Sequence, residues 1–156
     1  MTDEEFMDIA LAEAALAGID GEVPIGAVLV MDGKVIAKAH NLRETDRDAT
    51  AHAEILAIRQ ACRVLQRWRL SGATLYVTIE PCPMCAGALV MSRIDRLVYG
   101  SHDSKAGAVE SLFNIVQHNS LNHRLSVTAG IRAEESAELM RDFFRQRRRA
   151  SIEQDS

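Results

Sequence analysis

The sequence predicts an α/β domain in which helices cover both faces of a mixed β-sheet. Two strand-like runs, Ile25–Met31 and Lys34–Ala39, are separated by Asp32-Gly33, a dipeptide typical of a tight hairpin turn, so this pair should be antiparallel. After the hairpin, helical and strand-like segments alternate, as they do where parallel strands are joined by crossover helices. One hairpin joined to a parallel section makes the sheet mixed.

The remaining elements follow from hydrophobic spacing and end signals. Thr2 and Glu5 have the spacing of a capping box, and apolar residues then recur at helical spacing until Gly18. Residues 41–50 form a polar loop, and residues 101–124 show no regular pattern. Further helices are expected at His52–Val64, Pro83–Met91 and Glu134–Arg149. Further strands are expected at Thr74–Ile79, Leu97–Tyr99 and Leu125–Thr128.

Length and composition indicate one soluble domain over residues 1–156, with a core from about residue 5 to 150 and a disordered end. The chain is 47% apolar and 26% charged, and it has no apolar run near the roughly 20 residues that span a bilayer. Met1–Phe6 is acidic and lacks the basic start of a signal peptide. With only three cysteines, the chain is expected to be cytoplasmic, without a membrane partner.

Charge is distributed unevenly along the chain. The formal net charge is -4, which taken alone disfavours a nucleic-acid partner. Acidic residues crowd Asp3–Glu22, whereas four arginines cluster near the C-terminus, at positions 145, 147, 148 and 149. Because the local potential governs attraction to phosphate, this cluster is either a nucleic-acid contact or a solvated helix end.

The strongest functional signal is His52-Ala53-Glu54, followed by Cys82-Pro83-Met84-Cys85. A histidine and two cysteines are typical zinc ligands, and the cysteines, three residues apart, can share one helical face. A structural zinc normally has four protein ligands, whereas a catalytic zinc has three and leaves the fourth position to water. The sequence therefore predicts one catalytic zinc ion per subunit, held by His52, Cys82 and Cys85.

Glu54 is the catalytic residue in this interpretation. Residues two apart diverge in a regular helix, so His52 and Glu54 can converge only at the helix tip. Zinc lowers the pKa of its bound water, and Glu54 can then transfer the proton to a ring nitrogen and later to the departing amine. Zinc-dependent nucleobase deaminases are already known to use this residue set, with the glutamate as acid and base rather than as ligand.

Other interpretations of the motif are weaker. The two cysteines could form a redox dithiol or half of a structural zinc knuckle. Cys62 lies ten residues beyond His52 on the same expected helix, or about 15 Å away at 1.5 Å per residue, so it cannot complete the site. It is expected to pack in the core. The other histidines have no ligand-like spacing and are expected at the surface or in loops: His40, His102, His118 and His123.

The zinc motifs resemble those of the cytidine deaminase-like superfamily, and further segments resemble the bacterial tRNA-specific adenosine deaminases. The resemblance runs from about residue 5 to 150. Its segments are Glu22–Val28, Thr50–Glu54, Thr74–Thr78, Glu80–Cys82, Met84–Ala88, Asp103 with Lys105, Gly107-Ala108, Asn122–Arg124 and Asp142–Phe144. It implies a three-layer α/β/α fold with five strands, a homodimer, and hydrolytic conversion of the wobble adenosine of a tRNA anticodon stem-loop to inosine with release of ammonia.

The resemblance also implies substrate-binding residues. Asn41 matches the asparagine that hydrogen-bonds the target base, and the main chain of Ala53 and Glu80 is similarly placed around it. Asp103 and Lys105 match contacts to the RNA strand. Phe144, with the terminal arginines, could support flanking nucleotides by stacking and charge. Without the resemblance, the favoured interpretations are a turn residue for Asn41, a loop cap for Asp103 and a core residue for Phe144.

Two positions depart from the pattern of the family, and two other functions remain open. Ala49 stands where a proline is common, and Leu42 where a basic residue is frequent, so this loop could differ in stiffness or in RNA contact. A deaminase of free cytosine, guanine or a nucleoside would use the same zinc site. A non-catalytic zinc module that binds RNA would not need Glu54.

Overall fold

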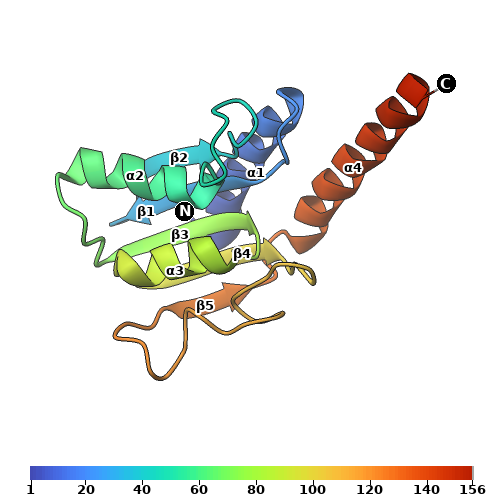
Figure 1. The fold of residues 1–156 in the computed structure, drawn as a ribbon. Helices are drawn as coiled ribbons and strands as arrows, with labels where there is room; N and C mark the ends of the chain where they lie inside the picture. Colours follow the sequence, from blue (N-terminus) through green and yellow to red (C-terminus); the bar gives the residue numbers. More distant parts are fainter. Residues whose placement is uncertain (156) are drawn as a thin grey trace.

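The computed structural model describes residues 1–155 and contains one five-stranded mixed sheet flanked by helices (Figure 1). The strands lie in the order β2-β1-β3-β4-β5. The β1 strand pairs antiparallel with β2 and β3, whereas β4 pairs parallel with β3 and β5. The strand bounds are β1 Gly26–Met31, β2 Lys34–His40, β3 Ala73–Ile79, β4 Arg96–Ser101 and β5 Ser126–Ala129. The predicted α/β class and the mixed sheet are confirmed.

Helices form two layers around this sheet. In Figure 1, α2 and α3 lie in front of it and α1 lies behind it, whereas α4 extends to the right; α4 contacts α1, β3 and β4. Their bounds are α1 Asp3–Ile19, α2 Ala53–Leu65, α3 Pro83–Met91 and α4 Ala133–Asp155. Alternate residues of β1 face the two layers. Ala27 and Leu29 belong to the core under α2 and α3, whereas Val28 and Val30 pack against α1.

The local signals in the sequence act as expected. Thr2 and Glu5 form both hydrogen bonds of the capping box that begins α1. Asp32 and Gly33 have φ angles of 52° and 74°, so both central residues of the β1–β2 turn lie in the left-handed region that tight hairpins require.

The last helix is longer than predicted. It continues to Asp155 instead of ending near Arg149, because the polar residues after Arg149 contain no proline or glycine that would end a helix. The last few residues were expected to be disordered. One of them, residue 156, lies outside the described residues. No helix among residues 1–155 is both long and apolar enough to cross a membrane.

The topology brings three segments to one edge of the sheet. Because β3 and β4 are parallel and Ile79 pairs with Ser101, the chain leaves both strands at the same edge. The turn after β3 leads into α3, and the segment after β4 enters the long loop of residues 102–125. The loop after β2 leads into α2. The functional residues predicted from the sequence lie on these segments, except Phe144, which lies on α4.

Candidate metal centre

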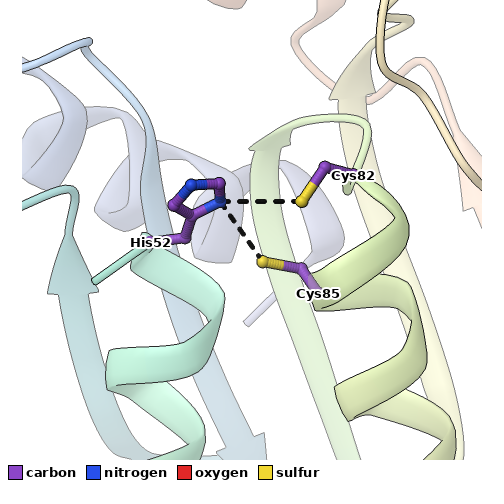
Figure 2. A group of neighbouring side chains, drawn as sticks. All are labelled: His52, Cys82 and Cys85. Carbon is purple, nitrogen blue, oxygen red and sulfur yellow. Dashed lines mark hydrogen bonds between the residues drawn. The ribbon is translucent and has the colours of Figure 1, made fainter. Parts of the chain in front are cut away.

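His52, Cys82 and Cys85 converge between the first residues of α2 and α3 (Figure 2). Their ligand atoms all lie within 4.8 Å of one another. The Nδ1 atom of His52 is 3.6 Å from Cys82 Sγ and 3.5 Å from Cys85 Sγ. Among the side chains that the structure describes, those of residues 1–154, this is the one group of three or more that is close enough to hold a metal ion, and Cys62 is not part of it.

The two helices begin in the same way. His52 and Cys82 are the N-cap residues of α2 and α3, and neither side chain caps its own helix. Their carbonyl groups still accept the first helical hydrogen bonds, from Leu56 and Ala86 respectively. Pro83 at the first helical position needs no hydrogen-bond acceptor for its nitrogen. Both N-cap side chains are therefore left to point into the space between the helices.

The charges of the three groups depend on one another. Hydrogen bonding to Cys85, together with His52, lowers the pKa of Cys82 to about 4, whereas the hydrogen bond to Cys82 and burial raise the pKa of Cys85. Hydrogen bonding to Cys82 also raises the pKa of His52. The close contact of the two sulfurs therefore favours the thiolate form of Cys82 and the thiol form of Cys85.

Glu54 is a buried carboxyl group beside this centre, with 4% of its surface exposed. It occupies the second position of α2, at the helix tip where the sequence places it. Burial raises its pKa to about 7. A carboxyl group whose pKa lies near neutral pH is suited to act as both acid and base.

Asn41 is also buried, and its amide is fixed by α2. Its Oδ1 atom accepts a hydrogen bond of 2.8 Å from the backbone N–H of Ala53, the first residue of the helix. This contact fixes the orientation of the amide, because only the oxygen can accept. The NH₂ group of Asn41 is thus the part of the amide left to donate to another molecule.

Glu80 has a role for its side chain that the sequence did not reveal. Its Oε1 atom accepts hydrogen bonds from the Asp103 N–H and the Ser111 hydroxyl, and its Oε2 atom accepts from the N–H groups of Val109, Glu110 and Ser111. Burial opposes ionisation, but these donors outweigh it and lower the pKa of Glu80 to about 2. From the sequence, only the main chain of Glu80 was expected to have a role.

Glu22 is the second residue that sequence reasoning missed. Its side chain is buried, and it accepts hydrogen bonds from the N–H groups of Glu44 and Thr45 and from the Thr45 hydroxyl. Burial alone would raise its pKa, but these bonds outweigh it and the pKa is lowered. A charged residue among apolar neighbours next to a strand is the signal that could have indicated both carboxylates.

Asp103, Lys105 and Phe144 lie around one groove. A cavity of about 500 Å³ is lined by all three, together with Met140 and Arg141 of α4. An adjoining cavity of about 420 Å³ adds Arg145 and Arg148. The structure therefore brings the residues expected to contact RNA, which lie in two distant parts of the sequence, onto one basic surface.

Side-chain contacts within this groove resolve two of the open alternatives. Asp103 Oδ1 accepts hydrogen bonds from the N–H groups of Lys105 and Ala106, so Asp103 does cap its loop. Phe144 is 38% exposed and lies edge-on to Phe143, with ring centres 5.3 Å apart. Phe144 is thus not a core residue, and its ring can reach another molecule.

Comparison with known proteins places the chain in a family. A family model of MafB19-like deaminases matches residues 1–148. The tRNA-specific adenosine deaminase of Bacillus subtilis (strain 168) is 52% identical over 147 residues, 94% of this chain and 91% of that protein. The tRNA-specific adenosine deaminase of Agrobacterium fabrum is 52% identical over 92% of this chain and 94% of its own length. The chain belongs to the tRNA-specific adenosine deaminase family.

Solved structures agree with this membership. A structure from a study of A-to-I editing by tRNA deaminases at the wobble position of transfer RNA has a TM-score of 0.84 and 52% identity, over 86% of this chain and 98% of that one. A guanine deaminase from Bacillus subtilis has a TM-score of 0.65 and 40% identity, over 74% of this chain and 73% of its own. The likeness to the tRNA enzyme is the greater in all of these measures.

Proposed function

We propose that this chain is a zinc-dependent hydrolase that converts adenosine to inosine at the wobble position of a tRNA anticodon and releases ammonia. The observation that carries the proposal is the group of His52, Cys82 and Cys85 with the buried Glu54 beside it, in a chain of the tRNA-specific adenosine deaminase family. A purely structural metal site needs no extra buried carboxyl group.

The spacing of the three ligand atoms fits zinc. Zinc binds histidine nitrogen at about 2.0–2.1 Å and cysteine sulfur at about 2.3 Å, so a tetrahedral ion separates the two atoms by about 3.6 Å. The Nδ1–Sγ distances of 3.6 and 3.5 Å match this value. When bound, zinc would lower the pKa of a coordinated water molecule and so supply the nucleophile at neutral pH.

Glu54 and Asn41 act on the substrate in this proposal. Glu54 accepts a proton from the attacking water at its carboxylate and delivers it to a ring nitrogen of the adenine. It then takes the remaining proton from the newly added hydroxyl group and passes it to the departing amine, which leaves as ammonia. Asn41 holds the base by donating from its NH₂ group, which the bond from Ala53 keeps in place. The main chain of Ala53 and Glu80 lines the space around the base.

The groove between the 103–111 loop and α4 holds the RNA strand. Lys105 and the arginines of α4 provide cations for phosphates, and Phe144 provides an exposed ring on which a flanking base can stack. We further propose that the enzyme acts in the cytoplasm as a homodimer, as the resemblance to the family implies.

The test is deamination by the zinc-loaded protein of an anticodon stem-loop with adenosine at the wobble position, followed by mass analysis of its nucleosides. Inosine should form at that position, and free adenosine, guanine and cytosine should react far more slowly. Glu54→Ala should reduce turnover by at least about 10²- to 10⁴-fold, the usual contribution of a general acid and base, and retain one zinc ion per chain.

Three results would contradict this function. Equal or faster turnover of free guanine would favour the activity of the 40% identical guanine deaminase. Loss of zinc from Glu54→Ala would make Glu54 a ligand or a structural support instead of the acid and base. Binding of RNA without any turnover by the unaltered protein would favour a non-catalytic module.

A further inference from the structure

We infer that Glu80 is a positioning residue whose side chain sets the place of the RNA-binding loop relative to the metal centre. The inference rests on the proposed function, because it concerns how the 103–111 loop meets the RNA strand. Glu80 lies between β3 and Cys82, so its main chain belongs to the turn that carries a metal ligand. Its side chain, by contrast, forms its hydrogen bonds with the 103–111 loop.

The contacts of Glu80 reach both ends of the loop. Asp103 lies at its beginning and Ser111 at its end, and both donate to the same carboxylate oxygen. Three consecutive N–H groups, from Val109 to Ser111, donate to the other oxygen at 2.8–3.1 Å. The loop is thus wrapped around one buried charge, and a carboxylate is the one side-chain group that can accept from all of these donors.

The neighbouring residues leave little freedom in this arrangement. The carbonyl of Pro81 accepts a hydrogen bond of 2.8 Å from the Ala108 N–H, so the turn contacts the loop through its main chain as well. Gly107 lies directly against the Glu80 carboxyl group, and a Cβ atom added there would overlap that group and the Asp103 carbonyl. Glu110 accepts a hydrogen bond from the hydroxyl of Tyr99 on β4. The loop therefore fits this carboxylate in one position only.

A short series of hydrogen bonds leads from Glu80 to the proposed RNA contact. The Asp103 N–H donates to Glu80 at 3.0 Å, and the Lys105 N–H donates to Asp103 Oδ1, also at 3.0 Å. Lys105 and Asp103 in turn line the groove beside α4. Glu80 therefore acts on RNA binding through Asp103 and Lys105, and it need not touch the RNA itself.

The principal test is Glu80→Gln in the zinc-loaded enzyme with the anticodon stem-loop as substrate. However the amide turns, its NH₂ group faces at least one backbone N–H, so part of the loop must move away. KM should rise about tenfold or more, while kcat changes less than about threefold and one zinc ion per chain is retained. Glu80→Asp, which keeps the charge, should recover part of the KM.

A double-mutant cycle with Lys105→Ala shows whether Glu80 acts through the loop. If it does, the double variant should have nearly the same KM as Glu80→Gln alone, because Lys105 is already misplaced. Gly107→Ala displaces the loop without removing the charge of Glu80, because the added Cβ overlaps the carboxyl group, and it should reproduce the KM effect. Asp95→Asn is the matched control: Asp95 accepts from the Gly72 N–H near the start of β3, far along the strand from Glu80, so its KM should be unchanged.

Several results would overturn the inference. The first is that Glu80→Gln loses zinc and has a lower kcat at constant KM. The second is that the effects of Glu80→Gln and Lys105→Ala are additive. The third is that neither Glu80→Gln nor Gly107→Ala has an effect. If Glu80→Gln does not fold, Gly107→Ala and the cycle of Gly107→Ala with Lys105→Ala decide in its place. The unaltered enzyme is assayed in parallel, so absence of inosine there refutes the proposed function. Stem-loop affinity of the same variants, measured by fluorescence anisotropy, would still decide the positioning role.

Discussion

Two loops meet the metal centre, and each is built around a buried carboxylate. The first, residues 41–50, is held by Glu22 and leads directly into His52. The second, the 103–111 loop, is held by Glu80 and has no short covalent path to a ligand. Glu22 accepts only from two consecutive residues, whereas the donors to Glu80 span the whole loop.

The difference follows from how each loop is connected. Chain continuity and the Asn41–Ala53 hydrogen bond already place the first loop beside α2, so Glu22 has only to hold its tip at Glu44 and Thr45. The second loop depends on side-chain contacts for its position. Substitutions in the first loop should therefore affect binding of the target base or the stability of the protein. Substitutions in the second loop should affect the affinity for RNA.

Within the two loops, the largest effect is expected at Asn41, where the first loop meets the substrate. Asn41→Asp keeps an oxygen that can accept from Ala53 but removes the NH₂ donor, so α2 should begin as before while the base loses a hydrogen bond. We expect kcat/KM for the stem-loop to fall about 100-fold, with little change in the free energy of unfolding. Steady-state kinetics and urea unfolding measure the two quantities.

Asn41→Ala separates the two roles of this side chain. It leaves the Ala53 N–H unpaired in a buried place, so it should lose activity and also about 1–3 kcal/mol of stability. If Asn41→Asp keeps near-normal kcat/KM, the NH₂ group does not bind the base, and Asn41 serves only to fix the start of α2.

The metal centre could be predicted from sequence, whereas the two carboxylate-centred loops could not. His52, Cys82 and Cys85 are recognisable because their chemistry and spacing are rare, and the helix starts that carry them have clear local signals. The donors to Glu80 lie 23 to 31 residues further along the chain, and most are backbone N–H groups, which every residue except proline possesses. Such contacts leave no pattern in the side chains.

The groove beside α4 shows the same distinction. Lys105 and Phe144 were predicted to bind RNA from resemblance alone, and no pattern along the chain indicates that they are neighbours. They meet because α4 returns across β3 and β4, a property of the three-dimensional packing. The predicted end of α4, near Arg149, was also wrong. The last turns of the helix are exposed and have no apolar residues at helical spacing, so the sequence does not indicate that the helix continues.

A smaller effect, on stability rather than on turnover, is expected at Glu22. Its pKa is lower in the folded protein than its ordinary value of 4.5, so the folded state binds fewer protons. Its contribution is complete above about pH 4.5 and is lost as the pH falls through the folded pKa. Glu22→Gln should therefore be about 1–3 kcal/mol less stable at neutral pH, and the difference should shrink in acid.

Urea unfolding of both proteins at neutral pH and at about pH 3 measures this difference. Glu44→Gln is the control, because Glu44 is an exposed neighbour with only a 3.8 Å ion pair to Arg43. A stability difference that stays constant with pH would mean that Glu22 holds the loop by packing and not by its charge.

The smallest effect is expected from Lys105→Ala, which removes one cation of the second loop without disturbing Glu80. Its backbone N–H still donates to Asp103, so the loop should keep its shape. KM for the stem-loop should rise only about two- to fivefold at constant kcat. The slope of the logarithm of binding affinity against the logarithm of salt concentration should fall by about one, the contribution of one phosphate contact. Lys38→Ala, an exposed lysine on β2, should change neither. An effect of Lys105→Ala on kcat as large as that of Asn41→Asp would show that the two loops do not divide base and strand recognition between them.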